Sequence, residues 1–199
     1  MKKITLIAIA MFFWQFVFGQ ISRTLQLPGN FIFNIQNGDR LIYKVSANGD
    51  TYNFEVTVKE NLERLYFDWF MPQKDFNGQV ILEKEARANA TIYKNIFQNG
   101  DEWNFKDSAT VWFSRKNFME AKKGSTTLVL DESPPVKFTK EAGETFKILY
   151  KGREVNLRNF NLKASSDNVD RSLRIMDNPS NSLILRMNLG WTIILKEVQ

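Results

Sequence analysis

The sequence predicts an α+β protein that is mostly β, with one curved antiparallel sheet and two short helices, one of which covers the sheet. Three features indicate this class. Strand-like segments with alternating apolar residues follow one another at short spacing. Asn-Gly pairs, which are typical of tight hairpin turns, separate several of these segments. Two segments, 83–97 and 114–123, have helical patterns instead. Short links between successive strands favour a meander of antiparallel neighbours.

The Asn-Gly pairs mark expected turns, because both residues tolerate the positive φ angles that tight turns require. In the clearest hairpin, Asn48-Gly49 joins segment 40–46 to segment 51–58, and apolar residues alternate with polar ones in both. The apolar set of this hairpin is Leu41, Tyr43, Val45, Phe54, Val56 and Val58. The other pairs are Asn37-Gly38, Asn77-Gly78 and Asn99-Gly100, and Lys151-Gly152 is a similar turn between 144–150 and 154–157.

Further strands are expected where β-branched and aromatic residues cluster between turn residues. They are 65–71, 79–82, 102–106, 110–113, 126–131, 158–163, 172–176, 182–187 and 191–198. Three of them (65–71, 182–187 and 191–198) carry apolar residues on both faces. In a sheet with one solvent-exposed face, apolar and polar residues alternate regularly along each strand. We therefore expect the second face of these strands to be covered, and 65–71 to be a central strand.

The two remaining segments are expected to be helices. In 83–97, Ala86, Ala90, Tyr93 and Phe97 share one helical face, although alternating alanines would also fit a strand. Alanine favours helices and is depleted in strands, so helix is the preferred interpretation, and this helix is the natural cover for the sheet. In 114–123, Ser114 is a suitable N-cap and Gly124 follows the last helical residue.

The first nineteen residues have the pattern of a secretory signal peptide. Two lysines follow Met1, the apolar stretch 4–18 is interrupted only by Gln15, and cleavage is expected before Gln20. The apolar stretch is shorter than the roughly 20 residues of a membrane-spanning helix. We expect 20–199 to form a single β-rich domain without a transmembrane segment. The protein is expected to be exported to the periplasm or the extracellular space.

Composition argues against several functions. The chain contains neither Cys nor His. It therefore lacks thiol nucleophiles, thiolate metal ligands, a Cys-linked lipid anchor and the commonest general base. The net charge is +5, with no long basic block, so nucleic acid is not an expected partner. The acidic residues do not form the spaced loop of a calcium site. We expect a protein that is not an enzyme and that needs neither metal nor cofactor.

The residues around Asp68 form the candidate site, because a carboxylate stands there among aromatic side chains. One interpretation is a carboxylate in an apolar pocket that anchors a ligand. The other is a carboxylate at the solvent edge, or one paired with a cation such as Arg186 or Lys196. The predicted ligand-binding residues are Tyr66, Asp68, Trp69, Phe70, Arg186 and Lys196. The aromatic residues could also be core packing, which is their commoner use in sheets.

Several sequence blocks together resemble those of secreted bacterial domains. In order they are R-L-I-Y-K-V, L-Y-F-D-W-F, G-Q-V-I-L-E-K-E-A-R, T-V-W-F-S-R-K-N-F and D-N-P-S-N-S-L-I-L-R-M-N-L-G-W-T-I-I-L-K-E-V. Such domains are similar in architecture to the half-barrels of the lipoprotein-localisation factors, in which a sheet folds around a helical lid and holds acyl chains. The resemblance implies a half-barrel fold. The lipid-handling residues of those carriers have no identifiable counterpart in this sequence.

Three functions follow as hypotheses. The first is a non-catalytic binding module that holds a lipid or another hydrophobic small molecule in a half-barrel pocket. The second is a structural or protein-interaction domain of the cell envelope with a filled core, whose partner is an envelope protein. The third is a carboxylate-based hydrolase, which would need two acids in one cleft, a pairing that the sequence does not indicate.

Overall fold

The computed structural model describes residues 33–164 and 170–199. The predicted signal peptide, 1–19, lies outside these residues. The first strands are β1 (Arg40–Ala47), β2 (Asp50–Asn61), β3 (Leu65–Met71), β4 (Phe76–Leu82), β5 (Ile92–Tyr93), β6 (Glu102–Phe105) and β7 (Ser108–Ala109). The later strands are β8 (Ser125–Leu130), β9 (Val136–Ala142), β10 (Phe146–Tyr150), β11 (Arg153–Leu157), β12 (Asn159–Ala164), β13 (Ser172–Met176), β14 (Ile184–Asn188) and β15 (Thr192–Val198). The helices are α1 (Lys84–Asn89) and α2 (Arg115–Lys122).

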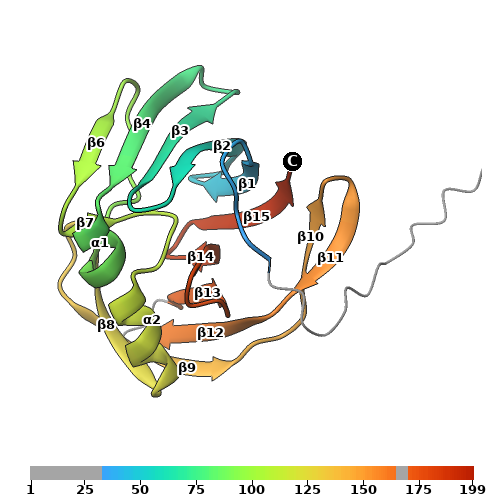
Figure 1. Ribbon diagram of the computed structural model, residues 1–199. Coiled ribbons are helices and arrows are strands. Elements are labelled where there is room, and N and C mark those ends of the chain that lie inside the picture. The colour runs from blue at the N-terminus through green and yellow to red at the C-terminus, as the bar shows by residue number, and fades with distance from the viewer. Residues whose placement is uncertain (1–32, 165–169) are drawn as a thin grey trace, which may run out of the picture.

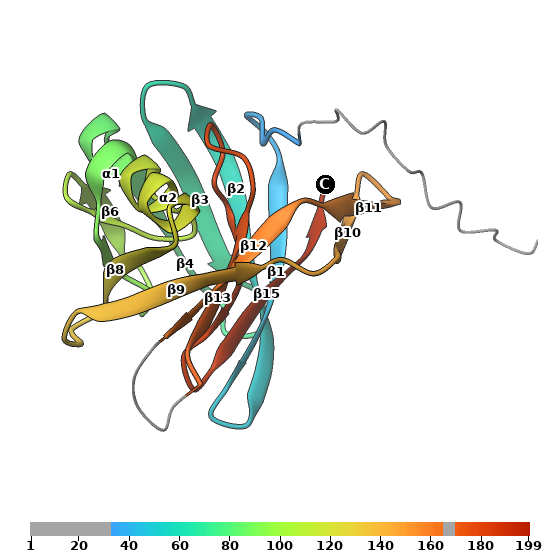
Figure 2. The same cartoon turned by 90° about the horizontal axis from the view of Figure 1, so that it is seen from below.

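The strands form a nearly closed, curved sheet with a half-barrel-like shape (Figures 1 and 2). Its order is β6-β4-β3-β2-β1-β15-β14-β13-β12-β9-β8-β5-β7, and the β10–β11 hairpin is attached to β15. Most neighbours are antiparallel, but β4–β6, β5–β7, β5–β8 and β10–β15 are parallel. The predicted class, mostly β with two short helices and a curved sheet, is confirmed. The sheet is mixed rather than purely antiparallel, because β4 reaches β6 through a crossover that contains α1 and β5.

Most of the expected turns are present. Asn48 and Gly49 have φ angles of 53° and 87°, and Lys151 and Gly152 have φ angles of 48° and 77°. Both pairs therefore have positive φ at the two central residues, as tight hairpin turns require. Gly38 and Gly100 also have positive φ. However, both follow irregular segments and lead into a single strand, β1 and β6 respectively, so neither joins two strands of a hairpin.

The prediction of a turn at Asn77-Gly78 is wrong. Both residues lie inside β4, and the turn that precedes this strand includes Asp75, whose φ is 53°. Gly78 has a different reason to be glycine. A Cβ atom at this position would lie 2.2 Å from the carbonyl oxygen of Asp101 and 2.7 Å from the indole ring of Trp69. Glycine in a strand often marks such a close approach.

The helix predicted over 83–97 is only partly present. Helix α1 ends at Asn89, the chain turns at Ala90, and β5 follows directly. One residue from each part, Ala86 and Tyr93, is buried, so the apolar pattern reflects burial of two different elements. The second helix matches its prediction: the Ser114 hydroxyl caps α2 by accepting a hydrogen bond from the Asn117 N–H at 3.2 Å.

Two errors concern the strands. Segment 110–113 is not a strand, and only an isolated bridge joins Trp112 to Leu183. Strand β9 was not predicted from the sequence, although Val136 and Phe138 alternate there with polar residues and are buried. Two prolines directly before this strand favour a loop and conceal its start. In the structure β9 lies between β8 and β12.

The prediction that β3 is covered on both faces is also wrong. Leu65, Phe67, Trp69 and Met71 are buried on the inner face, whereas Phe70 on the outer face is 38% exposed. Helix α1 buries Ala86 in the same core cluster as that inner face, so it adds to the interior and leaves the outer face uncovered. Helix α2 packs against β8 and β9, where Phe118 and Ala121 join a second cluster. Aromatic residues on the outer face of β3 therefore do not indicate that this face is covered.

In the part of the chain that the structure describes, no helix is long and apolar enough to cross a membrane. Only α1 and α2 were found there, with six and eight residues respectively. A membrane-spanning helix needs roughly 20 apolar residues.

We predict that the protein loses stability as the pH rises above about 10, because of two buried tyrosines. Burial raises the pKa of Tyr43 well above its usual 10.0, and burial also raises the pKa of Tyr93. Above pH 10 both phenols ionise more readily in the unfolded chain, which then binds fewer protons than the native state. Each group lowers the free energy of unfolding by up to about 1.4 kcal/mol per pH unit.

Thermal unfolding between pH 9 and 11 tests this prediction. The Tm should fall steeply in the wild type and less steeply in Tyr43→Phe and Tyr93→Phe variants, each compared with its own value at pH 8. A Tm that declines equally in all three proteins would show that other groups cause the loss.

Candidate functional site

An apolar cleft opens into the half-barrel between the inner face of the sheet and the irregular segments around residues 95–97 and 110–111. Its lining residues are Tyr43, Val45, Tyr52, Phe54, Met71, Asn95, Phe97, Thr110, Val111, Ile184, Met187, Trp191 and Ile193. Apart from the tyrosine hydroxyls, only Asn95 and Thr110 contribute polar side chains. The enclosed volume is about 50 Å³. This is small beside the 300–1,000 Å³ of typical ligand pockets.

Strand alternation explains how the sheet presents this lining. Tyr43 and Val45 are two residues apart on β1, so both side chains point inward, and Phe54 on β2 lies opposite Tyr43 in the register. The Tyr43 hydroxyl donates a hydrogen bond to the Ile184 carbonyl at 3.2 Å. This bond links β1 to β14, which are separated in the sheet only by β15. It therefore fixes the back wall of the cleft.

The opposite wall contains a strained backbone position. Val111 has a φ of 59°, which is a genuine outlier for a β-branched residue. The N–H of Trp112 donates to the Thr110 carbonyl, so these three residues form a γ-turn of the rare positive-φ kind. The Val111 carbonyl accepts a hydrogen bond from the Ile184 N–H at 2.8 Å, which ties the turn to β14. Strain of this type is concentrated at ligand sites and switch regions.

Aromatic rings continue from the cleft into the core. Phe97 lies 4.7 Å from the ring of Phe54, 5.1 Å from that of Trp69 and 4.7 Å from that of Trp103, measured between centroids. Phe97 therefore forms part of the cleft wall and rests on Trp69. The Trp69 Nε1–H is buried and has no hydrogen-bond partner among the described residues. The side chains behind the cleft are thus almost entirely apolar.

The predicted site residues lie on different surfaces. Trp69 is 1% exposed and stands behind the cleft without lining it. Tyr66, Asp68 and Phe70 are on the outer face of β3. Asp68 is paired with Lys59 at 3.0 Å, and both side chains are nearly half exposed. Asp68 is thus a solvated carboxylate with a cation beside it, which matches the second interpretation of this residue but with a different partner.

A β-bulge explains why Lys59 is that partner. Val58 lies opposite Phe67 and Glu60 opposite Tyr66, so Lys59 is the extra residue of β2. A bulge re-aims the side chain that it carries. The hydrogen bond and the charge of Asp68 raise the pKa of Lys59. Burial and the nearby Asp68 raise the pKa of Tyr66, whose hydroxyl donates to Gln79 Oε1 at 3.1 Å.

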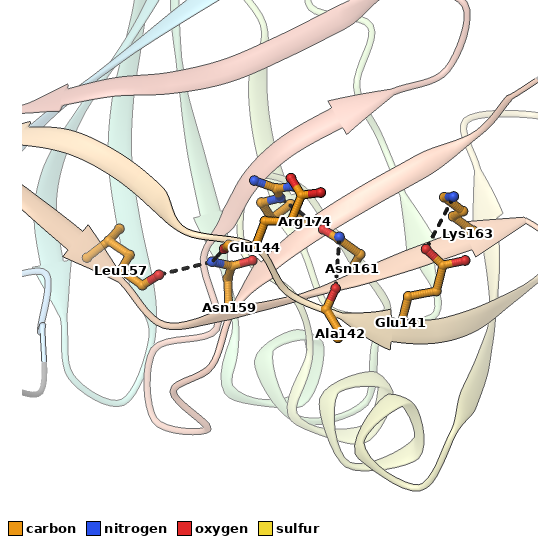
Figure 3. A network of polar contacts seen from close by, with 8 residues as sticks. All are labelled: Glu141, Ala142, Glu144, Leu157, Asn159, Asn161, Lys163 and Arg174. Carbon is orange, nitrogen blue, oxygen red and sulfur yellow. Dashed lines mark hydrogen bonds and ion pairs between the residues drawn. The ribbon is translucent and has the colours of Figure 1, made fainter. Parts of the chain in front are cut away.

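Neither Arg186 nor Lys196 lies near Asp68. Lys196 is exposed and is the extra residue of a bulge in β15, opposite Ile42 and Tyr43 of β1. Arg186 on β14 faces Arg174 of β13 across the ladder. Arg174 lies in a polar network, where it donates to Asn161 at 2.9 Å and to Glu144 at 3.2 Å (Figure 3). Arg186 borders the same polar surface in a hollow of about 240 Å³.

The cleft itself was missed at the sequence level. The five strands that line it, β1, β2, β3, β14 and β15, were all predicted, and in β1 and β2 the inward residues, including Tyr43 and Phe54, are correct. The other wall depends on Phe97 and Val111, which lie in segments that were assigned to a helix and a strand. Nothing in the sequence indicates the γ-turn at Val111. The partly buried Trp191 beside Gly190 was a usable signal, because turns lie at the surface and tryptophan is rarely fully buried.

Chemically, the cleft suits binding better than catalysis. It has no charged lining side chain, so the hydroxyls of Tyr43 and Tyr52 are its only candidate groups for proton transfer. Elsewhere in residues 33–164 and 170–199, no group of three acidic side chains is placed to hold a metal ion.

Comparisons of this chain with protein-family models, with curated proteins and with solved structures found no match. The resemblance to secreted half-barrel domains therefore stays a prediction.

Proposed function

We propose that this protein is a non-catalytic binding module that takes a hydrophobic small molecule or an acyl chain into the apolar cleft. The observation that carries the proposal is the lining itself, which is aromatic and aliphatic except for Asn95 and Thr110. Apolar ligand sites have this composition, with a few polar groups that orient the ligand. The half-barrel-like shape is what the resemblance to the lipoprotein-localisation factors would imply.

The ligand must widen the cleft, because about 50 Å³ is too small for it. The wall at 110–111 is the part most suited to move, since it has no regular strand pairing and holds the strained Val111. Release of this γ-turn would relieve backbone strain of about 1–3 kcal/mol, which offsets part of the cost of opening. Trp191, half-buried at the turn between β14 and β15, borders the same opening.

We also propose that the protein works outside the cytoplasm, in the periplasm or the extracellular space. The support is the signal-peptide pattern of residues 1–19. Such a protein would receive lipids or other apolar molecules that need a carrier in water.

A variant in which a larger side chain fills the cleft tests whether the protein is a binding module. We expect the wild type to take up a fluorescent fatty acid at about one molecule per chain, and Val45→Phe to lose this uptake because the larger ring fills the cleft. Val129→Phe is the matched control, since Val129 lies on β8 and does not line the cleft. Native mass spectrometry of the secreted protein, before and after solvent extraction, shows whether a natural ligand is carried.

A second candidate function is a protein-interaction domain of the envelope with a filled core. The small enclosed volume of the cleft favours it. If the wild type binds no fatty acid and carries no extractable molecule, the binding module is wrong and this candidate remains. Uptake that is equal in Val45→Phe and in the wild type would also argue against the cleft as the site.

A further inference from the structure

A second, larger hollow lies between α1, the start of α2 and the loop that precedes β14. Its volume is about 410 Å³, within the range of small-molecule sites, and it shares no lining residue with the apolar cleft. Its apolar lining consists of Leu82, Ala86, Ala88, Ala109, Trp112 and Phe113 together with Leu62 and Pro179. We call this site the basic hollow, because three of its lining residues are Lys84, Arg87 and Arg115. It continues into a shallower depression beside Asn34 and Gln36.

The charges of the basic hollow are unbalanced. Lys84, Arg87 and Arg115 face a single acidic lining residue, Glu63. Among the described residues, none of the three cations has a carboxylate within 4.0 Å. Such a site attracts an anion, and its walls focus the positive potential.

Arg87 is the most constrained of these cations. It donates to the Leu62 carbonyl at 2.6 Å and to Asn61 Oδ1 at 3.0 Å, so its guanidinium is held in place by two neutral acceptors. Burial lowers the pKa of Arg87. A partly buried charge is usually paired with an opposite charge, and Arg87 still has N–H groups that these two bonds do not use.

Asn181 provides a separate indication of a ligand. Its side chain is buried (the residue is 4% exposed), and its Oδ1 accepts a hydrogen bond from the Trp112 indole N–H at 2.8 Å. This bond fixes the orientation of the amide, because the indole can only donate. The Nδ2 group then has no acceptor among the described residues. An unpaired buried donor is costly, and an oxygen atom of a ligand would remove that cost.

We propose that the basic hollow binds a small amphiphile with an oxyanion head, a carboxylate or a phosphate. The head lies among Lys84, Arg87 and Arg115, and Asn181 Nδ2 donates to one of its oxygens. The short apolar body packs on Leu62, Ala88 and Pro179, the apolar lining residues that are exposed or partly exposed. This site is independent of the apolar cleft, so each can exist without the other.

Titration calorimetry with four probes below their micelle concentrations tests the proposal. We expect octyl phosphate or octanoate to bind the wild type, and octyl glucoside, which has the same tail and no charge, to bind about tenfold more weakly. Inorganic phosphate should also bind more weakly, because it lacks the apolar body. Tight binding of inorganic phosphate alone, or equal binding of octyl glucoside, would overturn the proposal.

A pair of double variants with the same change in net charge localises the site. Lys84→Gln with Arg115→Gln should weaken binding of the better anionic probe about tenfold, and Lys116→Gln with Lys123→Gln should leave it unchanged. All four side chains are exposed, and only the first pair lines the basic hollow. Equal weakening by both pairs would mean nonspecific attraction, and absence of binding by either anionic probe would refute the site. A shift of the NMR resonances of the Asn181 side-chain amide on binding would support direct contact between this amide and the oxyanion.

Discussion

Replacing Gly78 with alanine is expected to destabilise the protein by about 3 kcal/mol, at the upper end of what overpacking costs. The added methyl group would lie 2.2 Å from a backbone carbonyl oxygen, that of Asp101, and 2.7 Å from the ring of Trp69. Neither the Asp101 carbonyl nor the Trp69 ring can shift easily. The carbonyl accepts the hydrogen bond from Gln79 that joins β4 to the segment before β6, and the Trp69 ring packs against both Phe54 and Phe97.

Urea unfolding of Gly78→Ala measures this effect, with Gly49→Ala as the control. Gly49 has a φ of 87° and open space around its Cα, so alanine there meets strain but no clash. We expect Gly49→Ala to cost only about 1 kcal/mol. Similar losses in the two variants would show that Trp69 and the Asp101 carbonyl move aside at little cost.

Replacing Asn117 with alanine is the second large effect, with an expected loss of about 3 kcal/mol from the free energy of unfolding. Asn117 is fully buried. Its Nδ2 donates to the Ala90 carbonyl at 2.8 Å and to the Tyr93 hydroxyl at 3.0 Å, and its Oδ1 accepts from Thr126 at 3.2 Å. One side chain thus holds α2 against the end of α1, β5 and β8. The alanine variant loses the two bonds from Nδ2 and the weaker contact with Thr126, whose hydroxyl has a shorter hydrogen bond to Glu120 at 2.8 Å, and it leaves a cavity.

Thermal or urea unfolding of Asn117→Ala measures the loss. Lys116→Ala is the matched control, because Lys116 is the preceding residue of the same helix and is exposed. It should change stability by less than about 0.5 kcal/mol. An Asn117→Ala protein that is as stable as the Lys116→Ala protein would show that the helices are held by apolar contacts alone. Because the Tyr93 hydroxyl accepts one of the Asn117 hydrogen bonds, this variant should also change how steeply the stability falls above pH 10.

Local sequence chemistry determined much of the fold. The hairpin of β1 and β2 follows from alternating residues around Asn48-Gly49, and α2 follows from the Ser114 cap and the glycine after its end. In each case the signal lies within about twenty residues, and the same residues provide the contacts that stabilise the element. The absence of Cys and His likewise needs no structure to exclude thiol and imidazole chemistry.

Tertiary contacts decided what the local signals left ambiguous. Asn77-Gly78 has the sequence of a tight turn but lies inside β4. Its glycine is required because Trp69 and the Asp101 carbonyl lie too close to leave room for a side chain, and no local sequence pattern indicates this contact. Ala86 in α1, Ala90 directly after that helix and Tyr93 in β5 are all buried, so a burial pattern that spans two elements was interpreted as a single helix. Asp68 is paired with Lys59 because a bulge in β2 re-aims that lysine.

The sequence by itself determined a β-rich chain with two short helices, the antiparallel pairing of successive strands from β1 to β4 and from β12 to β15, and a composition that disfavours several catalytic chemistries. Only the tertiary structure decided where that chain can bind a ligand. The apolar cleft and the basic hollow are both built from irregular segments and from residues far apart in the chain, such as Tyr43 with Ile184 and Trp112 with Asn181. The positions of such residues are set by closure of the sheet, and closure depends on many long-range contacts at once, which no short stretch of sequence encodes.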